Sequence, residues 1–430
     1  MSQTSSAKAI AIRAGLVLGG LFLFLVLLNA FGIWFASRSS NTAIARIAEA
    51  GQPVTLADLD APAPSKEEDA AAILAGVKQQ IQAVNTIFEP LFKDDEEIIF
   101  GFPLEPTDVR QIKAVFDMHP ELLPAFEQAA RATHYGVHVS ERDDPAGVIQ
   151  DVSDRGTIAR NVCRILSVRA MQLKLEGEFD AALEQCLTIF RLCRHFDREP
   201  LTTSFLNGLA CRNVGVMSTN AVLRAGEVSE PLRKALDEEL ALHDLNASLP
   251  PTFLSERAFG IASFQSVIET KWIWPLRAIW IRDLDDYLGV MDRAVSVAEK
   301  PFDMNGFSKI VGQRQLGDQT IVAMQSVLHS YQGSAELTAL LRCVRVLNAL
   351  LPLAKEGKTP TIEELPLPEE AKQDPFIRKP LRLRGSNEEG WIIYSVGANQ
   401  QDDNADGTDL KDVVLQPPRT TPLPPSQPGP

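Results

Sequence analysis

An acidic run near the C-terminus contains the side chains whose types and spacing most plainly suggest chemistry. Oxygen-bearing side chains recur along it and surround Gly407; they are Asp402, Asn404, Asp406, Asp409 and Asp412. Alternate carboxylates and amides can converge on one hard cation, and the glycine permits the sharp turn that such a loop needs. The pattern predicts a calcium site with these five residues as ligands. The alternative is a solvated acidic loop.

A second group of metal-ligand types lies in the first half of the chain. His134 and His138 are four residues apart, with Glu141 and Asp143 nearby. Both imidazoles would share one face only if the segment were helical. Gly136 lies between them and is a poor helix former. We therefore expect these histidines to have a surface or packing role.

The sequence contains none of the common catalytic motifs. It has no Gly-x-Ser-x-Gly, no phosphate-binding Walker loop, no His-Glu-x-x-His and no Cys-x-x-Cys. This favours a non-enzymatic scaffold or binding protein. The alternative is an envelope hydrolase or other enzyme whose site is assembled from scattered residues.

The element nearest the N-terminus predicts a membrane location. No charged residue occurs over residues 14–37, and at 1.5 Å per residue this run spans about 36 Å, enough to cross a hydrocarbon core. Its length, with no Ala-x-Ala site after it, favours an uncleaved transmembrane helix over a signal peptide. Gly15 and Gly19 form a small-xxx-small pair and Asn29 is polar at membrane depth, which predicts a homodimer face. The alternative is that glycine is simply common in such helices.

Charges beside the span predict its orientation. Lys8, Arg13 and the amino terminus precede it, whereas Arg38 and Arg46 follow it. This slight positive bias predicts a cytoplasmic N-tail over residues 1–13. The rest of the chain then faces outward, into the cell envelope.

Composition divides the remainder into four predicted parts, and the fold class is mostly α. A polar neck covers residues 38–65, and helical spacing of apolar residues dominates a body over 66–350. Prolines and glutamates mark a linker over 351–373. Alternating residues predict a small β module with a hairpin over 374–415, and seven prolines predict a disordered tail over 416–430.

The clearest unit of the body is a predicted helix pair at about 157–175 and 178–195. Its turn, Gly177-Glu178-Phe179-Asp180, resembles that of a tetratricopeptide hairpin, and Gly226-Glu227 echoes it 49 residues later. That period exceeds the roughly 34 residues of the family. The resemblance implies stacked helical hairpins, whose broad surface would bind a protein partner.

Two further patterns in the body each allow two interpretations. The cysteines at 163, 186 and 193 fall on apolar stripes with helical spacing, which predicts buried thiols, with an inter-helix disulfide as the alternative. Trp272, Trp274 and Trp280 repeat with cations among them. Such a segment is typical either of a buried aromatic cluster or of a surface that contacts a membrane or a partner.

The C-terminal module resembles the C-terminal region of major pseudopilins of type II secretion. The shared residues are Asp374-Pro375-Phe376, Lys379-Pro380-Leu381, the run Trp-Ile-Ile-Tyr-Ser-Val-Gly at 391–397, and the acidic run after it. The resemblance implies that the loop over 402–412 holds calcium. Val413 stands where an EF-hand has a bidentate glutamate, and the N-terminus lacks the cleavable leader of pseudopilins. We therefore do not expect a pilus subunit.

The whole chain is similar to a family of uncharacterised bacterial single-pass envelope proteins. The shared features are the anchor, the neck from Gly51 to Leu59, the helical body and the C-terminal module. The similarity implies the bacterial inner membrane, with the body in the periplasm. The net charge of −14 argues against a nucleic-acid partner. Together these features predict a membrane-tethered, non-enzymatic scaffold or binding protein.

Overall fold

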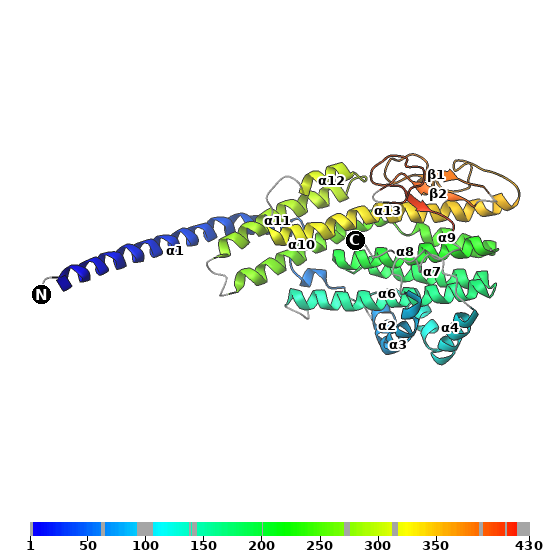
Figure 1. The fold of residues 1–430 in the computed structure, drawn as a ribbon, viewed down its shortest axis with the longest axis horizontal. Helices are drawn as coiled ribbons and strands as arrows, with labels where there is room; N and C mark the ends of the chain where they lie inside the picture. The colour runs from blue at the N-terminus through cyan, green and yellow to red at the C-terminus, as the bar shows by residue number, and fades with distance from the viewer. Residues whose placement is uncertain are drawn as a thin grey trace.

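The computed structural model of the chain describes residues 3–61, 65–92, 106–136, 139, 144–199, 201–270, 276–311, 317–386, 390–408 and 411–418. One long helix projects from one end of an elongated helical body, and a small sheet lies against the side of that body (Figure 1). The mostly α fold class is thus confirmed. The proline-rich residues 419–430 lie outside the described residues.

The first helix, α1 (Gln3–Glu49), extends well beyond the predicted span. No glycine or proline occurs over residues 33–50, so nothing interrupts the helix in the first part of the predicted neck. Gly51, with a φ of 70°, follows its end. The neck is therefore reduced to the residues after 49, which include the short helix η1 (Ala57–Leu59).

Two helices of the described residues are long and apolar enough to cross a membrane. The apolar window of α1 is 0% buried, whereas that of α13 (Asp318–Lys355) is 67% buried. Because a helix that is buried inside the body is a core helix, α1 is the candidate membrane anchor.

The other helices follow in chain order: α2 (Ala70–Gly76), α3 (Lys78–Phe88), η2 (Glu89–Phe92), α4 (Pro106–Met118), α5 (Leu122–Arg131), α6 (Pro145–Leu175), α7 (Phe179–Phe196), α8 (Thr202–Ala225), α9 (Glu230–Ala241), α10 (Leu245–Glu269), α11 (Arg277–Ala298), α12 (Met304–Val311) and α14 (Glu369–Lys372). A smaller core lies among α2 to α6 and the facing sides of α7 and α8. A larger core joins α7 to α13 and the sheet. The long helices α6, α7 and α8 separate the two cores.

The predicted helix hairpin is present as α6 and α7. Gly177 turns the chain with a φ of 82°, and the amide of Glu178 donates to the carbonyl of Leu173 at 2.9 Å. Helix α8 packs closely on α7, since a Cβ added at Gly215 would lie 3.0 Å from the Phe190 ring. Glycine at this position therefore sets how near the two helices approach.

The C-terminal module is a three-stranded antiparallel sheet in the order β1 (Arg382–Arg384), β2 (Ile392–Ser395), β3 (Val413–Leu415). The predicted hairpin is β1 with β2, where Leu383 pairs with Ile393; the third strand was not predicted. Ile393 and Leu415 belong to the same core as α13. The sheet is therefore part of the body.

The predicted linker over 351–373 is packed in part. Helix α13 continues to Lys355, because Pro352 lacks only one amide donor within an otherwise apolar helix. Ile362 and Leu365 then join the larger core. Helix α13 thus runs past the boundary predicted at residue 350, and the segment after it is irregular and mostly exposed, with Ile362 and Leu365 as its buried side chains.

Candidate functional site

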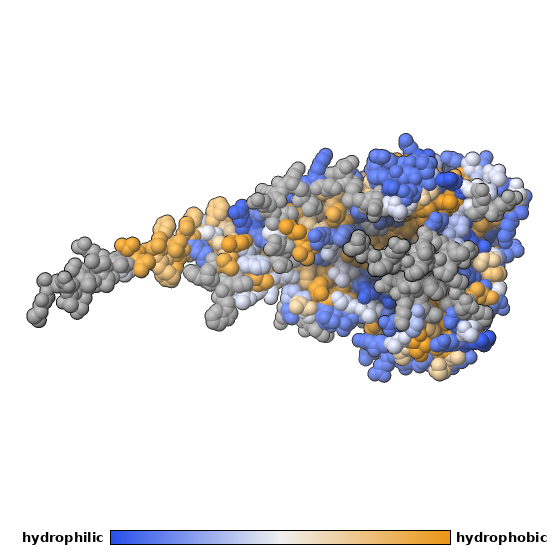
Figure 2. Space-filling model, viewed as in Figure 1, coloured by the Kyte–Doolittle hydropathy of each residue, from blue (hydrophilic) through white to orange (hydrophobic). Residues whose placement is uncertain are grey.

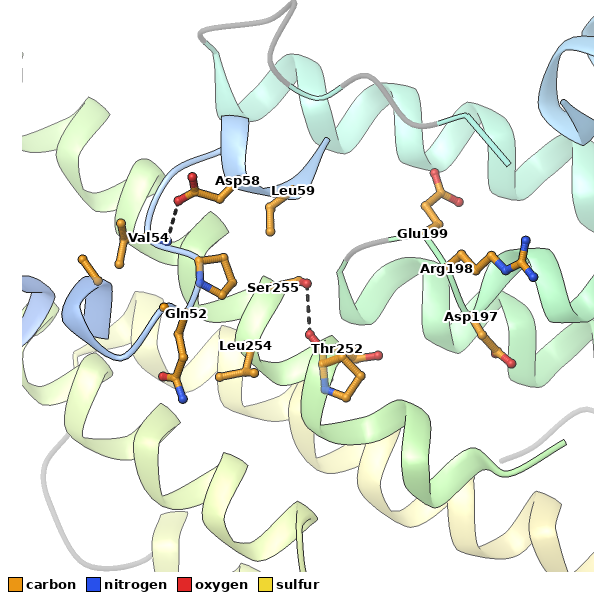
Figure 3. Close-up of a pocket in the computed structure, with 14 residues that line it drawn as sticks. Gln52, Val54, Asp58, Leu59, Asp197, Arg198, Glu199, Thr252, Leu254 and Ser255 are labelled. Atoms are coloured by element: carbon orange, nitrogen blue, oxygen red, sulfur yellow. Dashed lines mark hydrogen bonds between the residues drawn. The ribbon is translucent and has the colours of Figure 1, made fainter. Parts of the chain in front are cut away.

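A groove of about 630 Å³ lies where the chain after α1 crosses the body (Figure 3). Three segments line it, and we call it the neck groove. The last turn of α1 and the neck supply Ala48, Gly51, Gln52, Pro53, Val54, Asp58 and Leu59; the α7–α8 loop supplies Asp197, Arg198 and Glu199; and α10 supplies Pro251, Thr252, Leu254 and Ser255. Asp58 and Glu199 stand on opposite walls.

The neck wall is a turn closed by Asp58. Its carboxylate accepts hydrogen bonds from the amides of Val54 and Thr55, both at 2.9 Å. The hydrogen bond from Val54 is the largest influence that lowers the pKa of Asp58. Leu59 then enters the smaller core. The segment that follows Gly51 thus has a defined shape, with an ionised carboxylate at its centre.

The opposite wall contains a strained backbone residue between two buried carboxylates. Leu201 is buried and has a φ of 91°, a region that costs energy for a residue with a Cβ. The amide and hydroxyl of Thr202 donate to Glu256 at 3.0 and 2.8 Å, and Arg155 donates to Glu199 at 2.5 Å. Burial raises the pKa of both Glu199 and Glu256. These contacts hold the loop in its strained form.

Asp197 connects the groove to a buried polar network. The guanidinium of Arg212, fully buried on α8, donates to Asp197 at 2.5 Å and to the Cys193 carbonyl at 3.1 Å. It also donates to Nδ1 of His243 at 2.9 Å. Nε2 of His243 then faces Glu239 at 3.4 Å. This network ties α7, α8 and α9 together behind the groove.

The lining determines what the groove can hold. The lining holds three carboxylates, of Asp58, Asp197 and Glu199, and the guanidinium of Arg198. Asp197 and Glu199 are already paired with Arg212 and Arg155, so Asp58 is the carboxylate whose charge remains for a ligand. Arg198 also donates to the carbonyl of Thr133 at 2.5 Å. The described lining contains no histidine, cysteine or lysine, and its two hydroxyls, of Thr252 and Ser255, donate to backbone carbonyls of α10. A groove with prolines, a leucine and the carboxylate of Asp58 suits an extended peptide segment with a cationic side chain.

The acidic loop predicted to bind calcium lies beside the sheet, with Asp409 outside the described residues. Its side chains meet internal donors: Asp406 accepts from Lys411 at 2.5 Å, and Asp402 accepts from Tyr394 at 3.2 Å. Asp412 accepts from the amide of Ala405 at 2.6 Å. Within the described part of the chain no three metal-ligand side chains form a group that could hold an ion. Calcium binding stays a prediction.

The other residues singled out from the sequence fall in separate places. His134 pairs through its backbone with Glu68, whereas His138, Glu141 and Asp143 lie outside the described residues. Trp280 is partly buried with its ring 6.3 Å from that of Phe264; Trp272 and Trp274 lie outside the described residues. The cysteines are all free and buried, as the apolar stripes predicted.

The predicted homodimer face lies on one stripe of α1. No atom of the described residues comes within 4 Å of a Cβ added at Gly15 or Gly19. Asn29 lies further along the helix and is half-buried. Homodimerisation stays a prediction.

Sequence reasoning missed the neck groove, because its walls come from three segments far apart in the chain. The one local signal is the neck run from Gly51 to Leu59. Comparisons of the chain with protein-family models, with curated proteins and with solved structures find no match. The class that the fold and site define is a largely helical protein with an N-terminal candidate membrane anchor and a groove beside that anchor.

Proposed function

We propose that the chain is a membrane-tethered, non-enzymatic binding protein that captures a partner segment in the neck groove. The observation that carries this proposal is the clamp between the anchor helix and the wall of the groove. One carboxylate, that of Asp292 on α11, accepts from Arg46 of α1 at 3.2 Å and from Arg257 of α10 at 2.6 Å. The second terminal nitrogen of Arg257, Nη2, donates to the side-chain oxygen of Gln52 in the neck at 2.6 Å.

This clamp fixes the groove relative to the anchor. The Arg257 side chain is only 2% exposed, and a buried guanidinium holds its partners in a defined geometry. Gln52 lines the groove and is three residues past the end of α1. A partner in the groove would therefore be held at a fixed height above the bilayer.

The proposed partner is an extended protein segment with lysine or arginine side chains. The carboxylate of Asp58 supplies the electrostatic preference, and Pro53, Val54 and Leu254 supply apolar contact. The scaffold role predicted from the stacked helices is compatible with this groove. The proposed location is the bacterial inner membrane, with the N-terminus in the cytoplasm and the body in the periplasm, on the charge bias around the span.

Site-specific photocrosslinking in cells tests the proposal. A photoreactive residue in place of Ser255, in the groove, should give a discrete crosslinked protein. The matched control is Asn246, an exposed residue on the same helix α10 that lies outside the groove. The attached peptide should carry lysine or arginine at the crosslink. Equal products from both positions, or none from Ser255, would refute the groove as the binding site.

A further inference from the structure

Helices α1 and α11 lie side by side and run in the same direction at one end of the body (Figure 1). A Cβ added at Gly32 would lie 3.6 Å from the Cβ of Ala278. Ser39 donates to Asp285 at 2.9 Å, and Arg46 contacts Asp292 at 3.2 Å, each pair 246 residues apart. The three contacts recur every seven residues, as in a parallel coiled coil.

This register fixes the level at which α11 begins. With an offset of 246 residues, Arg277, the first residue of α11, lies level with Phe31 of α1. The charge-free run of α1 continues to Ser37. At 1.5 Å per residue, α11 begins about 9 Å inside that run. If α1 crosses a bilayer along this run, the first turn of α11 must lie below the bilayer surface.

The side chains at this level have the character of a lipid-facing surface. Leu276 and Ile279 are 53% and 65% exposed. At the same level α1 exposes three large aromatic side chains, Phe31, Trp34 and Phe35. Apolar side chains cover α1 and recur in patches, among polar ones, at the adjoining end of the body (Figure 2). Exposed apolar side chains gathered at one level mark a membrane or protein contact.

Past Arg277, α11 changes to charged residues at nearly the same level as α1. On α1 the first charged residue after the run is Arg38. On α11 four uncharged residues follow Arg277, and then come the exposed Arg282 and the carboxylates of Asp283, Asp285 and Asp286. The register places Arg282 level with Ala36. Two helices from distant parts of the sequence thus agree on one boundary between apolar and charged surface, which is what a bilayer surface requires.

The local polar groups also suit this depth. The Nε of Arg277 donates to the carbonyl of Ile268 at 2.8 Å, which satisfies an acceptor near the C-terminus of α10. Gly32 and Ala278 are small residues at the point where the helices approach, and small residues are the type that pack helices together in lipid. Trp280 is partly buried at the same level, and tryptophan is enriched at membrane interfaces.

We propose that the start of α11 is a second membrane contact, with lipid acyl chains covering Leu276 and Ile279 in the leaflet on the body's side. This inference rests on the membrane anchorage within the proposed function. The body would then be seated in the bilayer surface beside its anchor, instead of standing above it on a free neck.

Spin-label accessibility in the full-length protein tests this contact. Single cysteines would replace Leu276, Ile279, Leu23 within the span, and Leu242, which is 59% exposed at the end of α9. The native cysteines are buried, so the added thiols would be labelled selectively. The protein would be reconstituted in phosphatidylethanolamine–phosphatidylglycerol vesicles. Collision with oxygen reports lipid, and collision with a water-soluble nickel chelate reports water.

The oxygen-to-nickel collision ratio at positions 276 and 279 should be several-fold above that at 242 and near that at 23. A high ratio at position 23, with ratios at 276 and 279 equal to that at 242, would refute the second contact and leave the anchor supported. If position 23 also matches 242, the anchor itself is refuted, and the inference falls with it. Because all four side chains are exposed, these substitutions leave the packed core intact.

Discussion

At the scale of single residues, the body depends on buried polar groups whose protonation is set by burial. His195 on α7 illustrates this: its side chain is buried, and Nε2 lies 3.0 Å from the carbonyl of Ala129 on α5. Burial, together with a smaller effect of the charge of Arg198, lowers the pKa of His195 to about 4. The imidazole is therefore neutral in the folded protein at pH values where an unfolded histidine is charged.

This shift predicts a loss of stability in mild acid. As the pH falls from 6.5 to 4, His195 becomes protonated in the unfolded chain but stays neutral in the folded chain. The free energy of unfolding therefore falls, by up to about 3 kcal/mol. Above pH 6.5 the full contribution is present. Urea unfolding of the detergent-solubilised chain across this range should show the loss. His195→Gln should flatten it, whereas His329→Gln, at an exposed position, should keep the original slope.

A second prediction at this scale concerns a glycine. A Cβ at Gly260 on α10 would lie 2.2 Å from the hydroxyl of Tyr287 on α11. Tyr287 is 1% exposed, and its hydroxyl donates to the carbonyl of Glu256 at 2.8 Å, so its ring has no room to move. Gly260→Ala should lower the free energy of unfolding by about 1–3 kcal/mol. The measurement is thermal unfolding of purified protein.

Gly289→Ala is the matched control on α11. The nearest atom to its added Cβ is at 3.7 Å, on the flexible side chain of Arg293. Alanine there should raise stability by about 0.5–1 kcal/mol, because glycine is a poor helix former. Equal effects of the two substitutions would contradict the packing argument.

At the scale of elements, the clamp of Arg46, Asp292 and Arg257 between α1 and the body predicts how substitutions of Asp292 and Asp285 change stability. Asp292→Asn removes the charge opposite the buried Arg257. The Asp292 side chain is 35% exposed, so water would relieve part of the cost, and the loss of stability should be about 2–4 kcal/mol. Asp285→Asn, seven residues away and bonded to an exposed serine, should change stability by less than about 0.5 kcal/mol. Denaturant unfolding in detergent measures both.

Calcium binding by the acidic loop is a further prediction for one element. A calcium ion would have to replace Lys411 at Asp406 and Arg382 at Asp402, which favours weak affinity, with a Kd of about 10⁻⁴–10⁻³ M. Because the sheet packs on α13, the whole chain is the right sample for calorimetry. Asp402→Ala with Asp406→Ala should abolish the heat, and the exposed Asp117→Ala on α4 should not. No heat at several millimolar calcium would refute the site.

The elements that could be predicted from the sequence are those whose structure is determined by residues close together in the chain. The α6–α7 hairpin follows from apolar spacing and from the turn at Gly177, and the β1–β2 hairpin follows from alternation over a few residues. Strand β3 and the packing of the sheet on α13 were missed, because their partners are distant in the chain. The neck groove and the α1–α11 register were missed for the same reason. A contact across 246 residues leaves no periodic signal in either segment.

At the scale of the whole molecule, the side of the membrane on which the body lies is the main expectation to test. If the body is periplasmic, a cysteine in place of Leu242 should react with a membrane-impermeant maleimide in intact spheroplasts. A cysteine in place of Ser5, in the predicted cytoplasmic tail, should react only after lysis. The buried native cysteines provide a low background. The reverse labelling pattern would show that the slight charge bias around the span does not set the topology.

The parallel pairing of α1 with α11 has a consequence for synthesis. At about 5–20 residues per second, the 246 residues between the partners take about 12–50 s to translate. During that interval α1 can already occupy the bilayer while its partner does not exist. The waiting surface carries Ser39, Ser40 and Arg46 together with Ile44 and Ile47, and the two isoleucines pack in the larger core of the finished body. Until their partners are made, this stretch of α1 therefore exposes apolar side chains that only the later part of the chain can cover.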